Sequence, residues 1–351
     1  MNRKPGHRCS RGKRRRKNVA TLYLTEQGSV LRKADERLIV TRGEEVIDDI
    51  PLIKVDRVVV MGKGIKITTP VVFCLARRGV DLVYLTQRGG FVTRMEGGGS
   101  KFGQLRHAQA MTVGDDEKVL SIARQVVLGK LTNQRALVKR HAGGEPWGHK
   151  AAEGIDRMLA RLDGARDVDV VRGLEGQGAA LYFSAFRHLL KQDLGFTKRV
   201  YYPPTDPVNA LLSFGYTLLL NELIGAVQLV GLDPYLGFFH VIDYGRPSLA
   251  LDVEEEFRPL IVDSVVLYMV NKRVLTGADF TKPQGEKKAV YLSEKGRLAF
   301  IKAYEDRVST RVAYHLTGEK NTYRRCFELQ VRHLARVILG QDKVYRPMTM
   351  K

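Results

Sequence analysis

The pattern of hydrophobic positions changes near residue 95. Before it, short apolar runs rich in β-branched and aromatic residues alternate with turn residues, which is typical of strands. The predicted strands are Thr21–Leu24, Leu38–Thr41, Glu45–Ile47, Arg57–Val60, Leu82–Leu85 and Phe91–Thr93, with one short helix from about Pro70 to Gly79. After residue 104, apolar positions recur with the period of helices. We therefore expect an α+β protein, with a small N-terminal β domain (19–94) and a larger all-helical domain (105–345).

Turn and capping signals divide the helical part. Gly143, Gly144 and Pro146 separate a first predicted helix, which Asp115 or Asp116 caps and which ends near His141, from a second. The second covers 150–162, and later helices are predicted at 168–192, 208–231, 252–276, from 293 onward, and at 321–340. The glycine-rich residues 95–104 are predicted to be a linker between the two domains.

The charge of the chain restricts its partners. It contains 58 Lys and Arg against 38 Asp and Glu, a net charge of +20. This excess indicates a polyanionic partner, nucleic acid first and an anionic membrane second. Residues 1–18 hold nine of the cations and no acid, which predicts a disordered basic arm. A DNA-contacting arm and a solvated tail both explain this composition.

Cysteine usage and hydropathy indicate a cytoplasmic protein. Cys9, Cys74 and Cys326 form neither a disulfide framework nor a zinc spacing, which suits a reducing cytosol. The basic start of the chain lacks the apolar core of a signal peptide. The longest apolar run, 210–232, contains polar side chains that would be costly in lipid, including Glu222. We therefore expect a buried core helix there, and no membrane partner.

Three separate segments carry side chains that could bind a metal ion. Glu175 lies among small residues in a predicted helix, and His240 follows an apolar stretch. The third segment holds an acidic cluster at a predicted helix start, formed by Asp252, Glu254, Glu255 and Glu256. A carboxylate, an imidazole and a second carboxylate in so basic a chain suggest a divalent metal that acts on phosphate.

Each of these residues also has a purely structural explanation. Glu175 could pair with Arg172 while the glycines beside it allow close helix packing. A single histidine in an apolar context is more often a hydrogen-bonded core residue than a ligand. The helix dipole favours one or two acids in a first turn, although four adjacent carboxylates repel each other without a cation. Nearby basic residues could hold phosphates or pair with these acids: Arg172, Lys198, Arg199, Arg246 and Arg258.

Taken together, these segments resemble the CRISPR-associated integrase family, Cas protein one, the catalytic subunit of spacer acquisition. The matching stretches are Arg172–Phe183, Asp206–Tyr216, Gly231–His240, Leu249–Pro259 and, near the start, Thr21–Gly28. The resemblance covers about residues 19–340 and implies an N-terminal β domain before a helical catalytic domain. It also implies the metal ligands Glu175, His240 and Glu255, with Asp252 beside them. We interpret Glu254 and Glu256 as surface acids.

The resemblance further implies a metal-dependent DNA integrase and endonuclease. In this activity the 3′-hydroxyl of new spacer DNA is joined to the CRISPR array by transesterification, and hydrolysis of DNA is the side reaction. The implied cofactor is Mn²⁺ or Mg²⁺, and the imidazole favours Mn²⁺. The implied partners are double-stranded DNA (spacer precursor and CRISPR repeat), a second copy of the chain in a homodimer, and a small ferredoxin-like second adaptation protein. The alternatives are a non-catalytic nucleic-acid-binding scaffold and a plain metal-dependent nuclease.

Overall fold

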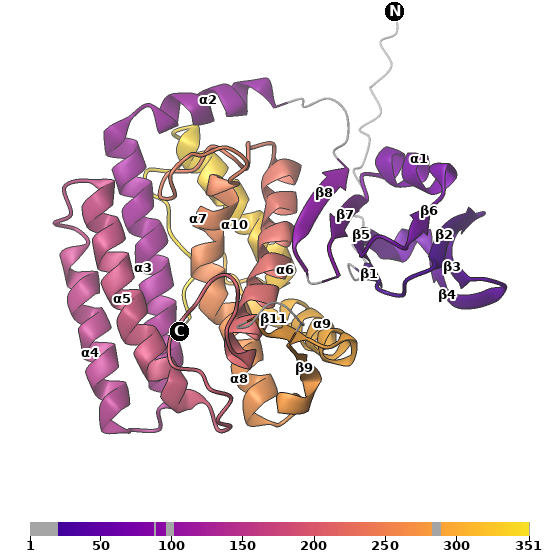
Figure 1. Cartoon of the computed structure of the whole chain (residues 1–351). Coiled ribbons are helices and arrows are strands. Elements are labelled where there is room, and N and C mark those ends of the chain that lie inside the picture. The colour runs from indigo at the N-terminus through magenta and orange to yellow at the C-terminus, as the bar shows by residue number, and fades with distance from the viewer. Residues whose placement is uncertain (1–19, 88, 96–101, 283–288, 351) are drawn as a thin grey trace, which may run out of the picture. The chain divides into compact units, whose positions relative to one another are not determined.

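The computed structural model describes residues 20–87, 89–95, 102–282 and 289–350 (Figure 1). The chain divides into two compact units, residues 1–87 with 91–98, and residues 88–90 with 99–351. The first is built on β-sheets and the second is mostly helical, so the predicted α+β class is confirmed. The predicted basic arm 1–18 and most of the predicted linker lie outside the described residues.

Among the described residues, the N-terminal unit contains two four-stranded sheets. The first has the strand order β1 (Ala20–Leu24), β5 (Val55–Met61), β7 (Asp81–Leu85) and β8 (Phe91–Met95). Its first three strands are parallel, and β8 is antiparallel to β7. The second has the order β4 (Glu45–Pro51), β3 (Arg37–Arg42), β2 (Ser29–Ala34) and β6 (Lys66–Ile67). Here β2, β3 and β4 are antiparallel, and β6 is parallel to β2.

The predicted strands correspond to six of these, and the predicted short helix is α1 (Thr69–Arg78), which ends at Gly79 in the left-handed conformation (φ 64°). Sequence reasoning missed β2 and β6. In β2, Leu31 is buried but Arg32 and Lys33 are exposed, so that strand lacks a run of β-branched residues. Side chains from both sheets and from α1 share one hydrophobic core, which includes Leu31, Leu38, Val58, Val71 and Leu75.

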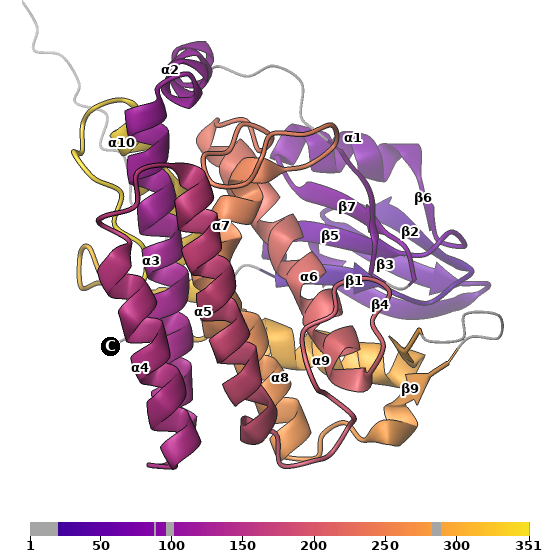
Figure 2. The ribbon, with the colours of Figure 1, turned by 60° about the vertical axis from the view of Figure 1, so that its left-hand side comes forward.

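The second unit is a helical assembly. Its helices are α2 (Gly103–Val113), α3 (Asp116–His141), α4 (Pro146–Arg161), α5 (Val168–Leu189), α6 (Pro207–Val230), α7 (Ser248–Arg258), α8 (Ser264–Asn271), α9 (Glu294–Val308) and α10 (Tyr323–Ile338). A π-helical turn, Pro259–Asp263, joins α7 to α8, and two short hairpins pair β9 (Phe280–Thr281) with β10 (Tyr291–Leu292) and β11 (Arg311–Ala313) with β12 (Lys320–Thr322). Helix α3 packs against α4, α5 and α7, and α6 packs against α7 and α10 (Figure 2).

Local side-chain caps fix several helix starts. The predicted cap Asp115 accepts a hydrogen bond from the backbone N–H of Lys118, and Asp167, Asp206, Ser293 and Thr322 cap their own helices in the same way. The apolar helix α6 is long and apolar enough to cross a membrane, but 78% of that apolar window is buried inside the protein. It therefore serves as the core helix that its sequence predicts.

Close packing of α5 on α3 depends on Gly178. A Cβ atom there would come within 2.4 Å of Leu131 Cδ2, whereas a Cβ at Gly173 on the same helix would meet nothing within 4 Å. We expect Gly178→Ala to lower the free energy of unfolding by about 1–2 kcal/mol, because overpacking outweighs the gain in helix propensity. Gly173→Ala, the matched control, should raise it by up to about 1 kcal/mol. Urea denaturation of both variants tests this, and equal effects would contradict it.

Candidate metal centre

The acidic cluster 252–256 lies inside the helical unit, on α7. This helix begins at Ser248, so the acids fall in its middle and not in its first turn. The prediction that Asp252 opens the helix is therefore wrong. The interpretation of Glu254 and Glu256 as surface acids is also wrong, because all four acids are about 1% exposed. The cause is the packing of α7 against both α3 and α6, which leaves the helix without a solvent face for them.

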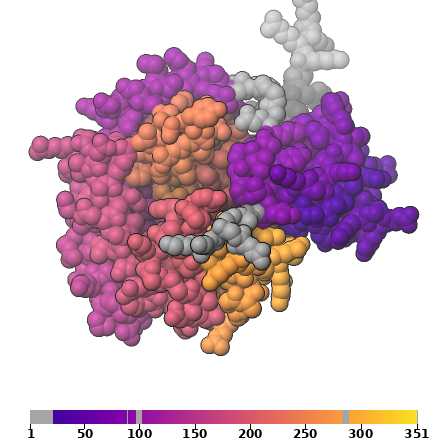
Figure 3. Space-filling view, viewed as in Figure 1, coloured from indigo at the N-terminus to yellow at the C-terminus, as the bar shows by residue number. Residues whose placement is uncertain are grey.

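Asp252 holds the loop that carries His240. Its carboxylate accepts the backbone N–H groups of Phe238 (2.6 Å), Phe239 (3.0 Å) and His240 (2.9 Å). The same carboxylate accepts His240 Nδ1–H at 2.8 Å. The segment 231–247 reaches the surface of the helical unit (Figure 3). Tyr244, in this segment, is fully exposed. Asp252 thus anchors the inner end of the loop and sets the orientation of the imidazole.

Glu254 and Glu256 have partners away from His240. Glu254 Oε2 accepts two bonds from the Arg258 guanidinium, at 2.7 and 3.1 Å. Burial raises the pKa of Glu254 to about 7, although Arg258 opposes the change. Glu256 accepts the Tyr345 hydroxyl at 2.8 Å and the Met348 backbone N–H at 2.6 Å. Burial raises the pKa of Glu256 to about 8. Glu254 therefore pairs with the last residue of its own helix, and Glu256 connects α7 to the C-terminal segment.

Glu255 is the acid of α7 that faces His240. Its Oε1 lies 3.5 Å from His240 Nε2 and accepts Arg258 at 2.6 Å, and its Oε2 lies 2.5 Å from the ammonium of Lys130 on α3. Burial alone would raise the pKa of this carboxyl. Arg258 and Lys130 outweigh that effect and hold the pKa well below its usual range. Glu255 is therefore a buried anion.

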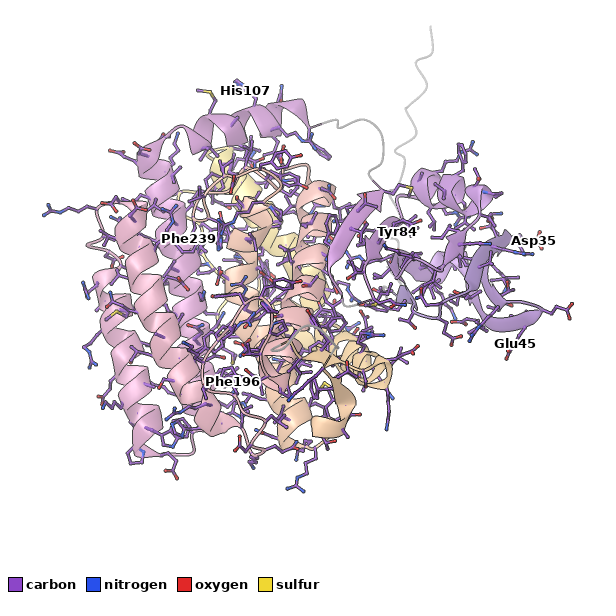
Figure 4. The ribbon with its side chains drawn as sticks, in the orientation of Figure 1. Asp35, Glu45, Tyr84, His107, Phe196 and Phe239 are labelled. Atoms are coloured by element: carbon purple, nitrogen blue, oxygen red, sulfur yellow. The ribbon has the colours of Figure 1, made fainter. Side chains whose placement is uncertain are left out.

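Glu175, on α5, meets the same ammonium. Lys130 Nζ lies 2.5 Å from Glu175 Oε1 and so bridges the carboxylates of Glu175 and Glu255. The Glu175 side chain is 20% exposed and that of Glu255 is 2% exposed, so the pair reaches solvent at the Glu175 end. The alternative pairing of Glu175 with Arg172 is not formed. Arg172 instead pairs with Asp169 and donates to the carbonyl oxygen of Phe239, at 3.2 and 3.0 Å. Figure 4 marks the position of Phe239 within the helical unit.

His240 is held between two carboxylates. Burial lowers the pKa of an imidazole, but the hydrogen bonds to Asp252 and Glu255 outweigh it and raise the pKa of His240 to about 9. Asp252 occupies Nδ1, so that Nε2 is the nitrogen that faces Glu255. This carboxylate–histidine arrangement commonly orients a metal-binding imidazole.

Sequence reasoning missed Lys130. Its side chain is only 7% exposed. Burial would lower the pKa of its ammonium, but Glu255 and Glu175 raise the pKa above its ordinary value. The signal was its position: Lys130 falls in register with Val127, Leu131 and Gln134 on the buried face of α3. A lysine at a core position of an amphipathic helix needs a buried partner, and here it has two.

The residues present fit a divalent ion, although a lysine now joins them. In the part of the chain that the structure describes, no three side chains of His, Cys, Asp or Glu are already arranged to hold a metal ion. The Lys130 ammonium instead lies between Glu175 and Glu255. The donors nevertheless suit Mn²⁺ or Mg²⁺, since two carboxylates and an imidazole with its Nδ1 held by Asp252 converge from α5, α7 and the loop that joins α6 to α7.

The five basic residues predicted to hold phosphates differ in accessibility. Lys198 is exposed, and Arg172 and Arg246 are half-buried. Arg199 lies over the rings of Tyr201 (4.7 Å) and Tyr216 (5.4 Å). Arg258 differs from these residues because it forms ion pairs with Glu254 and Glu255. Its guanidinium also lies over the ring of Tyr216 at 4.9 Å. Its guanidinium thus serves as an internal counter-charge for the acids.

Comparison with known proteins places the chain in a family. An N-terminal sheet unit and a helical unit in which carboxylates and a histidine converge are the parts expected of a CRISPR-associated nuclease or integrase. Residues 22–306 match the family described as CRISPR associated protein Cas1. The chain is 36% identical to CRISPR-associated endonuclease Cas1 3 of Thermus thermophilus (95% of this chain, 98% of the relative) and 36% identical to Cas1 2 of Rhodospirillum rubrum (96% and 100%). It therefore belongs to the Cas1 family.

Solved structures agree on the fold. A CAS1 protein from Thermotoga maritima superposes with a TM-score of 0.79 at 23% identity, over 93% of this chain and 99% of that one. A casposase bound to its integration product gives a TM-score of 0.81 at 22% identity, over 94% and 93% of the two chains. At these identities the likeness concerns the fold.

Burial of Glu256 predicts a pH-dependent stability. Its pKa rises from the ordinary 4.5 to about 8 in the folded chain. The folded protein therefore binds this proton more tightly than the unfolded chain, and the stabilising contribution is lost as pH rises from 4.5 through 8. We expect Glu256→Gln to gain stability relative to the parent between pH 5 and 8, on the order of 2–4 kcal/mol.

Urea denaturation at several pH values measures this difference. Glu319→Gln, which changes an exposed carboxylate in the same unit, is the matched control and should show a difference independent of pH. A pH-independent difference for Glu256→Gln as well would contradict the proposed burial of a protonated Glu256.

Proposed function

We propose that this Cas1 family member is a divalent-metal-dependent DNA integrase and endonuclease of CRISPR adaptation. It joins the 3′-hydroxyl ends of new spacer DNA to the CRISPR array by transesterification, and it hydrolyses DNA in a related reaction. The observation that carries the proposal is the convergence of Glu175, His240 and Glu255, which come from α5, the loop before α7, and α7 itself.

Each residue of the centre has a separate task in this proposal. Glu175, His240 and Glu255 hold the ion, which when bound polarises the scissile phosphate and acidifies the attacking hydroxyl. Asp252 fixes the tautomer of His240 so that Nε2 faces the centre, and through three backbone N–H groups it holds the loop in place. Arg258 balances the charge of Glu255 by a hydrogen bond to Oε1, the oxygen that Lys130 does not contact. The imidazole makes Mn²⁺ a better fit than Mg²⁺.

DNA contacts are proposed on the basic side chains near the centre. Arg172, Lys198, Arg199 and Arg246 could bind phosphates, whereas Arg258 is already occupied by carboxylates. Next to Arg199, Tyr201 is 69% exposed and Tyr202 is 83% exposed. Exposed aromatic rings beside a cation are typical of surfaces that stack nucleic-acid bases. We propose that this segment contacts unpaired ends of the DNA substrate.

Two features suggest the partners of this chain: its family membership and the exposed edge strands of its N-terminal unit. In a structure titled Cas6-RT-Cas1–Cas2 complex, 36% of one chain has the fold of the present protein (TM-score 0.81, over 95% of this chain). This supports a small, ferredoxin-like second adaptation protein as a partner of the present chain. We propose a homodimer formed through the N-terminal unit in the cytoplasm, because its edge strands β4 and β8 expose Val46, Ile47, Phe91 and Val92.

Removal of a proposed ligand should abolish strand transfer. We expect Glu175→Ala, His240→Ala and Glu255→Ala each to lose at least about a hundredfold in joining of a 3′-hydroxyl donor, with Mn²⁺ present. DNA affinity should change by less than about threefold, because Lys and Arg supply it. The matched control is Glu153→Ala, which removes an exposed carboxylate on neighbouring α4.

A joining assay with labelled DNA separates the alternatives. A donor with a blocked 3′ end should give no joined product. Product formed from the blocked donor by cleavage alone would favour a plain nuclease. Equal activity with and without a chelator would favour metal-independent chemistry, and no activity in any condition would favour a DNA-binding scaffold.

Metal binding should depend on pH through His240. Only the neutral imidazole binds an ion, and the pKa of His240 is about 9 rather than the ordinary 6.5. Below pH 9 the ion must therefore displace a proton, so apparent Mn²⁺ affinity should rise with pH up to about 9. At pH 7.5 we expect release of about one proton per ion, measured by titration calorimetry in buffers of different ionisation enthalpy. Proton-free binding would contradict this.

Introducing a charged residue on the apolar edge strand should dissociate the homodimer. Phe91→Glu places an anion on β8, and we expect the full-length variant to run as a monomer in size-exclusion chromatography with light scattering. Leu298→Glu makes the same change at an exposed position on α9 and should leave the dimer intact. A dimer in both variants, and in Val46→Glu on β4, would place the interface in the helical unit.

A further inference from the structure

Lys130 is the unexpected member of the centre. Its ammonium lies 2.5 Å from one oxygen of Glu175 and 2.5 Å from one oxygen of Glu255, on two different helices. The helix packs closely against the C-terminal segment at the neighbouring Gly129, where an added Cβ would come within 2.5 Å of Pro347. One turn farther along α3, Asn133 donates to the carbonyl oxygens of Glu256 and Met348, both at 2.8 Å. This part of α3 is therefore clamped against α7.

We propose that Lys130 is a built-in counter-cation of the metal centre, which holds Glu175 and Glu255 together in the metal-free protein and competes with the divalent ion for them. The inference rests on the proposed function, since it concerns the same centre. Two carboxylates that converge inside a protein repel each other unless a cation lies between them. The Lys130 ammonium supplies that cation, so the ligands are assembled before an ion arrives.

The same contact makes the ammonium a competitor. A divalent ion that binds both carboxylates needs the oxygens that Lys130 now occupies, so the ammonium must leave at least one of them. Glu175 is the one that it can leave. Its side chain is 20% exposed, against 2% for Glu255, and the surface beside it at Gly173 and Gly176 is open, with nothing within 4 Å of a Cβ placed there.

Two consequences distinguish a competing cation from a merely structural lysine. Removing the ammonium without removing the side-chain bulk should strengthen metal binding, because the ion no longer displaces a positive charge. It should also destabilise the metal-free protein, because a buried carboxylate pair is left with less compensation. A lysine that only supports the fold would lower stability and would weaken metal binding or leave it unchanged.

The test compares full-length Lys130→Met with the parent and with Lys139→Met. Lys139 lies on the same helix but is exposed, and it pairs with Asp156 at 3.6 Å. Calorimetric titration with MnCl₂ should give a Kd at least about tenfold lower for Lys130→Met than for the parent, and an unchanged Kd for Lys139→Met. The rise in melting temperature on saturation with Mn²⁺ should also be larger for Lys130→Met. Lys130→Arg, which keeps the charge, should show no gain in affinity.

Other results overturn the proposal. An equal or weaker affinity of Lys130→Met, with normal binding by the parent, would show that Lys130 does not compete, and the proposed metal centre would stand. A gain in Lys130→Arg as large as in Lys130→Met would assign the effect to shape and not to charge. If the unmodified protein does not bind Mn²⁺, both the counter-cation proposal and the proposed metal-dependent function are wrong. If Lys130→Met does not fold, Lys130→Gln carries the same comparison.

Discussion

The helical unit depends on partners for the carboxyl groups buried along α7, both the ionised and the protonated ones. Four carboxylates lie on one short helix with almost no solvent contact, and each needs a partner inside the protein. Asp252 takes backbone N–H groups and an imidazole, and Glu256 takes a tyrosine hydroxyl and a backbone N–H. Glu254 and Glu255 share Arg258, and Glu255 also takes Lys130. An unpaired charge here would cost several kcal/mol, so these partners determine how α7 packs.

This requirement links distant parts of the sequence to the centre. The partners of α7 come from α3, from the loop before α7 and from the C-terminal segment, where Tyr345 and Met348 bind Glu256. The C-terminal segment therefore holds α7 in place through Glu256, although it contributes no proposed ligand. A basic protein can keep such an acidic centre because its carboxyl groups are satisfied internally and do not add negative charge to the surface.

Much of the fold was predictable because local signals were strong. The β-branched runs predicted most strands, and Asp115 capped the helix that it was expected to cap. The start of α7 was not predictable in this way, since Asp252 looks like a helix cap in sequence but instead holds the loop of His240. Acids in a short run look like surface residues when their partners are distant in sequence, as for Glu256 and Met348, which are 92 residues apart.

The sequence predicted the proposed ligands of the candidate centre but not its lysine. Glu175, His240 and Glu255 stand in motifs whose order resembles a known family, and the structure brings them near one another. Lys130 belongs to no motif. Only its position on the apolar face of α3 indicated a buried cation, and only the packing of α3 against both α5 and α7 determines which acids it meets.

The central claim is that Glu175, His240 and Glu255 form a divalent-metal site whose resident ammonium gives way to the ion. A crystal structure of the full-length protein soaked with Mn²⁺, with anomalous data collected at the manganese edge, tests it most directly. The account predicts an anomalous peak within about 2.0–2.4 Å of both carboxylates and of His240 Nε2, with Lys130 Nζ moved away from Glu175. A saturated crystal in which Lys130 still bridges the two carboxylates, with manganese elsewhere or absent, would contradict it.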